Sequence, residues 1–305
     1  MRSEFLAAMV RQPQSTWLHR GLFQIHLWTG ISIGLYVVVV TVTGSALVYK
    51  AKLNALFTPP TVVTPSGPLK SEDELRRSAQ EQFPRFQVGR IEMPDRPDRP
   101  AVVTLARGRY EQFRLLDPYT AADLGLAGDE TPQILWLIDL HHNLLGGETG
   151  RMVNGVGALL LLVMCLTGPL IWWPGVGTWR RGLMVKRGVS WRRLTFDLHS
   201  MIGFWTVVLI FIWAVSGAYL AFPVLFQAIA DYVEPPELLG LTEVSWGEWI
   251  FAWLVRLHFG RQLGSPPFTD VIGWLWVVVG LAPTALFITG FTMWWQRVIR
   301  KRKLA

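Results

Sequence analysis

Four long apolar segments dominate this sequence and restrict the folds that it can adopt. They cover residues 27–49, 152–173, 201–222 and 271–295. A helix needs about 20 apolar residues to cross the hydrocarbon core of a bilayer, and each segment reaches that length. The chain also contains 16 Trp and has a positive mean hydropathy. We therefore expect an all-α membrane protein, a bundle of four transmembrane helices. The first segment is too long for the apolar part of a cleavable signal peptide, so we expect it to remain as a span.

The distribution of charge predicts the orientation of these spans. The two termini and the segment between the second and third spans hold 14 of the 29 Lys and Arg residues. Glu4 and Asp197 are the acidic residues there, so this face carries +12 and the other face −5. By the positive-inside rule, both termini face the cytoplasm. The basic residues then orient the helices and contact anionic lipid, and we expect no nucleic-acid partner.

The spans divide the chain into five parts. Residues 1–50 form the cytoplasmic N-terminus and first span, and residues 51–150 form an outer domain with an interfacial segment. Residues 151–222 hold the second and third spans with their basic cytoplasmic loop. Residues 223–270 form a second outer segment, rich in Trp and expected along the membrane surface or against the first outer domain. Residues 271–305 form the fourth span and a basic cytoplasmic tail, and Pro283 predicts a kink in that span.

The outer domain has the pattern of a small α+β fold. Ser71 and Glu74 form a capping box that opens a helix extending to about Gln82. Residues 86–93, 101–106 and 110–116 then alternate as short strands do, with Pro-, Asp- and Gly-rich turns between them.

An internal repeat relates the two halves of the membrane region. The approach to the second span reads Trp-Leu-Ile-Asp-Leu-His and ends at His141, and the approach to the fourth reads Trp-Leu-Val-Arg-Leu-His and ends at His258. Spans one and three share His-x3-Gly, with a second Gly 18 positions after the histidine. The further matched residues are Gly146 and Gly264, Thr167-Gly168 and Thr289-Gly290, Trp172-Trp173 and Trp294-Trp295, Gly30 and Gly203, and Gly44 and Gly217. The chain is thus predicted to be two copies of a two-helix unit.

The repeat places four histidines at two levels. His26 and His199 begin outward spans and share the cytoplasmic level, whereas His141 and His258 precede inward spans and share the outer level. Two imidazoles at one level suit the axial positions of a six-coordinate haem. We therefore predict two haem b groups with bis-histidine iron ligation, held non-covalently because no Cys-x-x-Cys-His occurs.

Neighbouring residues refine that prediction. Gly30 and Gly203 lie one turn from His26 and His199 and would leave room for a macrocycle. His142 is the alternative ligand to His141, and His19 falls outside the repeat. A histidine near a helix end can also be an interfacial residue, and that reading stays open for each one taken alone. Cys165 is the only cysteine, so neither a disulfide nor a cysteine metal cluster is available.

The sequence resembles the PepSY-associated transmembrane family of bacterial inner-membrane proteins, which includes iron-regulated ferric-siderophore reductases. The matching motifs are Leu140-His141 with Gly146, Thr167-Gly168 with Trp172-Trp173-Pro174, Leu198-His199 with Gly203, and Leu257-His258-Phe259-Gly260. The outer domain is similar to a PepSY module in its helix-then-strands order and in the turn Asp117-Pro118-Tyr119-Thr120, although Ala121 stands where the family has Gly.

The resemblance implies an oxidoreductase in the bacterial inner membrane that reduces a periplasmic ferric siderophore or other ferric chelate and releases Fe(II). Electrons would pass from a cytoplasmic donor through the haem of His26 and His199 to the haem of His141 and His258. No nucleotide-binding motif occurs, so the donor would be a quinol or a separate protein. No side chain is expected as a catalytic acid, base or nucleophile. The alternative is a non-enzymatic PepSY membrane protein that binds a peptide or regulates a protease or the assembly of a partner. Alternating-access transport is less compatible with four spans.

Overall fold

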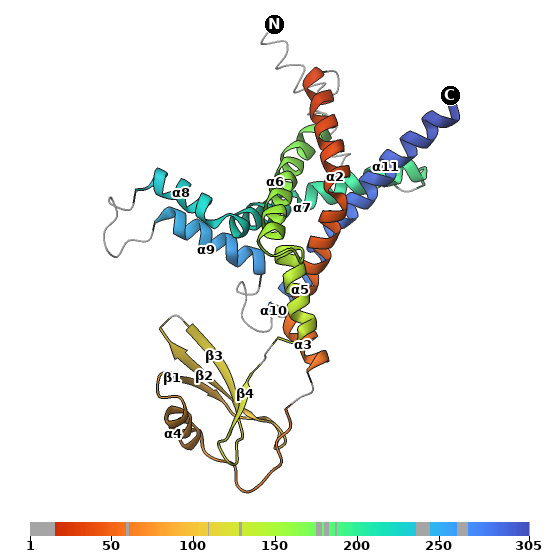
Figure 1. Ribbon diagram of the computed structural model, residues 1–305. Coiled ribbons are helices and arrows are strands. Elements are labelled where there is room, and N and C mark those ends of the chain that lie inside the picture. Colours follow the sequence, from red (N-terminus) through yellow and green to blue (C-terminus); the bar gives the residue numbers. More distant parts are fainter. Residues whose placement is uncertain are drawn as a thin grey trace. The chain divides into compact units, whose positions relative to one another are not determined.

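The computed structural model describes residues 16–58, 61–108, 110–127, 130–174, 179, 183–186, 188–235, 245–260 and 268–304. Gly264 and the basic residues Arg2, Arg11, Arg180, Arg181 and Arg187, which the sequence analysis used, lie outside these residues. The chain divides into two compact units: one consists of Met1–Tyr49 with Trp136–Ala305, and the other is Lys50–Leu135. Each unit is described here by itself (Figure 1).

The first unit contains four helices long and apolar enough to span a membrane, as predicted. They are α2 (Trp17–Leu47), α6 (Gly147–Trp172), α7 (Trp191–Ala221) and the segment Asp270–Ile299. Both α2 and α7 begin about ten residues before the predicted apolar segments. Thr16 and Ser190 are the N-cap residues, and the polar first turns continue the helix without adding to its hydropathy. His26 and His199 therefore lie well inside their helices.

The fourth span is interrupted near its middle. Helix α10 (Phe268–Gly280) and helix α11 (Ala282–Leu304) are separated by Leu281, two residues before Pro283. Proline has no amide hydrogen and its ring clashes with the preceding turn, which accounts for the break. The predicted kink is confirmed.

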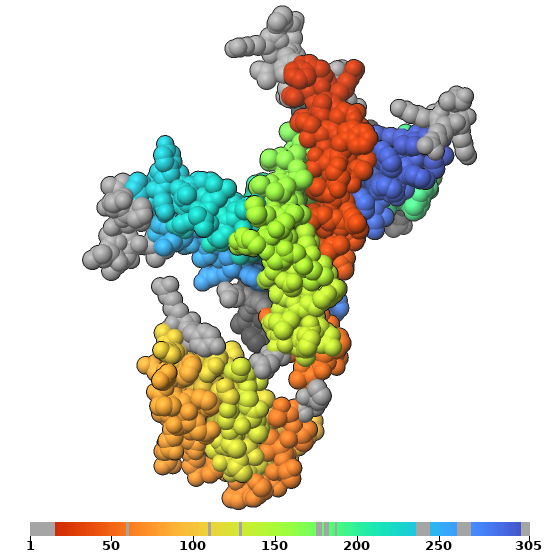
Figure 2. Space-filling model, in the orientation of Figure 1, coloured from red at the N-terminus to blue at the C-terminus, as the bar shows by residue number. Residues whose placement is uncertain are grey.

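The four spans pack in a ring. Helices α6 and α11 each contact both α2 and α7, so α2 and α7 face each other diagonally. Figure 2 shows α2, in red, lying directly against α6, in green. Glycines permit this close approach: a Cβ on Gly34 would overlap the ring of Phe287 on α11, and one on Gly157 would overlap the ring of Tyr36. Gly34 and Gly157 thus have the role that small residues commonly play between spanning helices.

Three shorter helices complete the membrane unit and its approaches. Helix α5 (Pro132–Asn143) leads into α6, and its first turn belongs to the second unit. Helices α8 (Pro223–Val233) and α9 (Trp246–Phe259) follow α7 and pack against each other and against α7. Large apolar side chains on both are exposed, with Val224 at 82% and Tyr232 at 87%. A place for this segment along the membrane surface stays a prediction.

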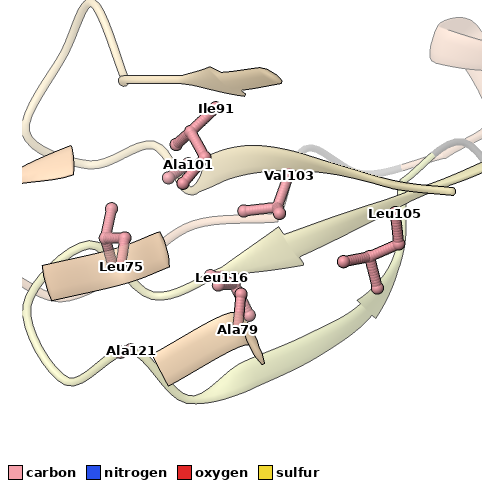
Figure 3. Packing of buried hydrophobic residues seen from close by; sticks show 8 residues of the cluster. All are labelled: Leu75, Ala79, Ile91, Ala101, Val103, Leu105, Leu116 and Ala121. Carbon is pink, nitrogen blue, oxygen red and sulfur yellow. The ribbon is translucent and has the colours of Figure 1, made fainter. Parts of the chain in front are cut away.

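The second unit is an α+β fold, as predicted. It contains α3 (Lys50–Phe57), α4 (Glu72–Gln82) and the strands β1 (Gln87–Glu92), β2 (Ala101–Arg107), β3 (Tyr110–Leu116) and β4 (Asp123–Leu126). The strands form an antiparallel sheet in the order β1-β2-β3-β4. Leu75 and Ala79 of α4 pack on alternate residues of β2, and Figure 3 shows these side chains converging between helix and sheet. Strand β4 was not predicted from the sequence.

Two local features of this unit follow the sequence closely. The capping box is present, because the Ser71 hydroxyl accepts from the Glu74 amide and the Glu74 carboxylate accepts from the Ser71 amide. In the turn after β3, Asp117 Oδ1 accepts from the amides of Tyr119 and Thr120. Ala121 has a φ of 63°, a left-handed conformation that glycine adopts more readily. The family preference for Gly at this position thus has a backbone cause.

Candidate functional site

The four repeat-matched histidines lie on four different helices and are all half-buried. His26 is on α2 and His199 on α7, within the spans, whereas His141 is on α5 and His258 on α9. Each ring bonds through Nδ1 to a hydroxyl of another helix. Their arrangement falls into two pairs.

The first pair consists of His26 and His199. His26 Nδ1 is 2.8 Å from Thr167 Oγ1 on α6, and His199 Nδ1 is 2.9 Å from Thr289 Oγ1 on α11. The two imidazoles belong to the diagonal helices α2 and α7 and are close enough for their charges to interact. Each therefore has a polar partner on a neighbouring helix and a second imidazole across the bundle.

The second pair consists of His141 and His258, whose ring centres are 6.3 Å apart with planes inclined by 54°. His141 Nδ1 lies 3.1 Å from Thr43 Oγ1 and 3.0 Å from the Val40 carbonyl oxygen, both on α2. His258 Nδ1 lies 2.7 Å from Ser216 Oγ on α7. The second pair thus repeats the imidazole–hydroxyl contact of the first.

The histidines of the second pair are neutral at physiological pH. Burial, followed by the neighbouring charge of His142, lowers the pKa of His141 to about 4. Burial, followed by the charges of His141 and His142, lowers the pKa of His258 to about 3. Neutral imidazole is the form that binds metals, since a protonated ring offers no lone pair.

Glycines bring three of the rings close to the adjoining helix. A Cβ on Gly44 would lie 2.7 Å from Cε1 of His141, one on Gly168 would lie 3.4 Å from Cε1 of His26, and one on Gly290 would lie 3.3 Å from Cε1 of His199. Each of these glycines directly follows the threonine whose hydroxyl bonds to Nδ1 of the same ring. Ser216 and Gly217 complete the set of four hydroxyl–glycine dipeptides whose hydroxyl bonds to a histidine, and each of the four spans contributes one of them. Thr167-Gly168 and Thr289-Gly290 were matched in the repeat, and the same recurrence could have identified Thr43 and Ser216 from the sequence.

Gly30 and Gly203, predicted to clear space for a macrocycle, face neighbouring helices. A Cβ on Gly30 would lie 3.0 Å from Cε of Met164, and one on Gly203 would lie 3.6 Å from Cδ2 of Leu286. Their role beside a cofactor stays a prediction.

Helices α5 and α9, which carry His141 and His258, are also held through their backbone. The Asn154 side chain on α6 donates to the carbonyl oxygens of His141 and His142, at 2.8 and 2.9 Å. The indole N–H groups of Trp213 and Trp276 both donate to the carbonyl oxygen of Leu257, at 3.2 and 3.0 Å. These carbonyls belong to the last turns of α5 and α9, where the helix itself offers no amide. The sequence analysis identified none of these three donors.

The other two histidines are placed differently. His19 Nε2 bonds to the Ile171 carbonyl oxygen at 3.1 Å, near the end of α6. His142 is exposed, with its ring centre 5.8 Å from that of His141. The structure therefore brings His141, and not His142, to the Thr43 hydroxyl.

The donor set limits what this site can bind. Within the part of the chain that the structure describes, no group of three or more His, Cys, Asp or Glu side chains could hold a metal ion. Cys165 is buried in α6 as a free thiol. A bare transition-metal ion commonly takes three or four protein ligands, whereas a haem iron needs only its axial ones. Two pairs of imidazoles fit the second kind of group.

Comparison with known proteins agrees with a membrane protein of this type. The family model described as the PepSY-associated TM region matches residues 23–244 and 227–297. A curated relative, the uncharacterized protein PA4219 of Pseudomonas aeruginosa, is 33% identical over 90 residues. That match covers 28% of this chain and only 21% of the relative's length. Because the family model covers most of the sequence, the chain belongs to the family of proteins with the PepSY-associated TM region.

Proposed function

We propose that this protein is a membrane oxidoreductase with two b-type haems that delivers electrons to a ferric siderophore or another ferric chelate. One observation carries the proposal: four half-buried imidazoles form two pairs, and each ring already has one nitrogen bonded to a hydroxyl. The other nitrogen of each ring remains to ligate iron.

The spacing of the second pair supports haem binding. A metal–imidazole bond is about 2 Å and the ligating nitrogen is roughly 1 Å from the ring centre, so iron between two rings separates their centres by about 6 Å. The observed separation of His141 and His258 is 6.3 Å. His26, His199, His141 and His258 would be the iron ligands, and bound haem would supply one-electron transfer that side chains do not provide.

The symmetry of the contacts supports a duplicated two-helix unit. Exchanging α2 for α7 and α6 for α11 converts the bond between His26 and Thr167 into the bond between His199 and Thr289. The same exchange, with α5 replaced by α9, relates the bonds of His141 and His258 to Thr43 and Ser216. Such a duplication would place one iron site near each end of the spans.

The direction of electron transfer follows from the charge of the two faces. With the +12 face in the cytoplasm, His26 and His199 lie toward the donor and His141 and His258 toward the periplasm. The donor would be a quinol or a separate protein, and the α+β unit would be a PepSY-like periplasmic domain. Both termini would be cytoplasmic in a bacterial inner membrane. Reduction of Fe(III) to Fe(II) weakens the binding of iron by hard oxygen ligands, so a ferric chelate would release its iron. An acceptor site on the periplasmic side would place that release outside the membrane.

The test uses full-length protein purified in detergent. A pyridine haemochrome assay should give about two haems per chain, and wild-type protein with well under one would reject the proposal. After anaerobic reduction, mixing with a ferric siderophore should reoxidise the haems and yield Fe(II) captured by a ferrous chelator. The variant His141→Ala should lose that reaction. Haems that stay reduced with every ferric chelate, yet reoxidise with quinone, would reject iron as the acceptor. Colourless protein would favour a non-enzymatic peptide-binding or regulatory role.

A further inference from the structure

The hydroxyl groups beside the four histidines have a second bond in common. Each donates to the backbone carbonyl four residues earlier in its own helix: Thr43 to Val39 at 2.7 Å, Thr167 to Val163 at 2.7 Å, Ser216 to Ile212 at 2.8 Å and Thr289 to Ala285 at 2.8 Å. Carbonyl oxygens only accept hydrogen bonds, so the hydroxyl must be the donor in all four. The direction of these bonds is therefore settled by chemistry alone.

The direction of the hydroxyl bond decides which imidazole nitrogen carries the proton. A hydroxyl has one hydrogen, and here that hydrogen is directed to the helix backbone. Toward the histidine the oxygen can then only accept, so Nδ1 must be the protonated nitrogen. At His141 the Val40 carbonyl, 3.0 Å from Nδ1, requires the same assignment independently. The lone pair of each neutral ring is consequently on Nε2.

We propose that Thr43, Thr167, Ser216 and Thr289 are positioning residues that hold their histidines in the Nδ1–H tautomer and leave Nε2 to ligate iron. This inference deepens the proposed function and rests on it for the identity of the metal group. At three of the sites the glycine after the hydroxyl contributes as well, because a methyl group at Gly44, Gly168 or Gly290 would lie close to the ring, whereas one at Gly217 would lie 3.6 Å from Cβ of Ala158. In the hydroxyl–glycine dipeptides of these three sites, the hydroxyl orients the imidazole through Nδ1, and the glycine leaves room for the ring beside the helix.

The bond to Nδ1 should also affect the iron. An accepted Nδ1–H hydrogen bond makes the imidazole a stronger electron donor, which stabilises Fe(III) over Fe(II). Removing the hydroxyl should raise the midpoint potential of the haem concerned. The four sites are not equivalent, since His141 keeps the Val40 carbonyl when Thr43 is changed and His199 keeps its backbone hydrogen bond to Leu286 when Thr289 is changed. Thr43→Val should therefore raise the midpoint potential of the haem held by His141 and His258 less than Ser216→Ala does.

The experiment compares four variants of the full chain: Thr43→Val, Thr167→Val, Ser216→Ala and Thr289→Val. Thr206→Val is the matched control, because the Thr206 hydroxyl makes the same bond to Ile202 in α7 and has no histidine partner among the described residues. Redox titration and low-temperature EPR of the oxidised haems are the readouts. Thr167→Val and Thr289→Val should raise the midpoint potential and alter the EPR signal of the haem held by His26 and His199. Ser216→Ala, and to a smaller extent Thr43→Val, should do the same for the haem held by His141 and His258. Thr167→Ser should restore the wild-type values.

Several outcomes would overturn the inference. It fails if all four variants titrate as Thr206→Val does, or if Thr167→Ser behaves like Thr167→Val. If the wild-type protein binds no haem, the proposed function fails first, and nitrogen NMR of protein isotopically labelled at histidine then decides the tautomer. Protonated Nδ1 in the four rings would sustain the assignment, and protonated Nε2 would refute it.

Discussion

A histidine placed in an apolar helix needs partners for both ring nitrogens. A buried polar group without a hydrogen bond costs about 1–3 kcal/mol, so an imidazole with only one partner would be unfavourable in such a site. Here a threonine or serine of a neighbouring helix satisfies Nδ1 of each ring. The remaining nitrogen is the one for which the proposed iron would be the partner. This division of roles would account for histidine, in place of an apolar residue, at all four repeat-matched positions.

The pairing of the histidines leads to a prediction at the residue scale. His26→Ala and His199→Ala should each remove the same haem, because the two imidazoles, on the diagonal helices α2 and α7, are close enough for their charges to interact. His141→Ala and His258→Ala should each remove the other. Haem content and EPR of the four purified variants measure this directly. A double variant of one pair should retain as much haem as either of its single variants.

His19→Ala is the control for this series. His19 lies on α2 two turns before His26, but its Nε2 bonds to a backbone carbonyl, so both haems should remain. If His26→Ala and His141→Ala removed the same haem, the level-by-level pairing would be wrong.

At the scale of elements, the sequence predicted what local chemistry determines. The apolar segments predicted the spans, and Pro283 predicted a distortion where α10 and α11 are separated. Ser71 with Glu74 predicted the start of α4. The early starts of α2 and α7 were missed because hydropathy measures burial in lipid and does not detect a polar first turn. Strand β4 was missed because it has four residues, one of them Gly125, and it is held by pairing with β3.

In the candidate site, too, the contacts that depend on tertiary packing were not predicted from the sequence. The repeat identified the four histidines, but not Thr43 and Ser216. Threonine and serine in apolar helices commonly bond to their own backbone, so their presence alone does not indicate a partner on another helix. The donors to the last turns of α5 and α9 depend on tertiary packing, because Trp213 and Trp276 reach Leu257 from different helices. No local pattern in the sequence specifies such contacts.

Close packing of α2 against α11 can be tested at Gly34. A methyl group there would overlap the ring of Phe287, so Gly34→Ala should destabilise the bundle by about 1–3 kcal/mol through overpacking. Thermal unfolding of the purified protein is the measurement. Adding Phe287→Leu should recover much of the loss. Gly21→Ala, in the same helix with nothing within 4 Å, is the control and should be neutral or slightly stabilising. Equal losses for Gly34→Ala and Gly21→Ala would contradict the packing.

The start of α4 should be sensitive to acid. Bonds from the Ser71 backbone amide and then the Ser71 hydroxyl lower the pKa of Glu74 below its ordinary value. A carboxylate with a lowered folded-state pKa stabilises the fold above its unfolded pKa, and that contribution is lost as pH falls through the folded value. Protection of the α4 amides from hydrogen exchange should therefore decrease on acidification through that range, after correction for the intrinsic rate. Glu74→Gln keeps a capping-box residue but removes the charge, so it should show lower protection at neutral pH and a flatter dependence; an unchanged profile would show that the charge of Glu74 contributes nothing.

For the whole molecule, the two units obey different physical rules. The membrane unit keeps many large apolar side chains exposed, such as Leu35 and Val208, which lipid can cover. The unit Lys50–Leu135 instead encloses its apolar residues between α4 and a sheet, as a domain in water does. The chain leaves and re-enters the membrane unit around this domain, at Tyr49 and Trp136. From the connectivity of the chain alone, we predict this domain on the side of the membrane where α2 ends and α6 begins.

The predicted orientation of that side follows from the +12 and −5 faces and can be tested by cysteine labelling. Cys165 is buried within α6, so Cys165→Ala supplies a background without reactive thiols. Glu111→Cys introduces an exposed thiol on β3, and Met184→Cys introduces one between α6 and α7, where the Met184 side chain is 65% exposed. In spheroplasts treated with a membrane-impermeant maleimide, Glu111→Cys should be labelled at once and Met184→Cys only after lysis. The reverse pattern would invert the orientation and place His26 and His199, instead of His141 and His258, beside the acceptor. Labelling of both positions in intact spheroplasts would contradict the odd number of crossings between them. Labelling of both positions only after lysis would contradict it equally, because α6 is the one candidate span among the described residues between the two sites.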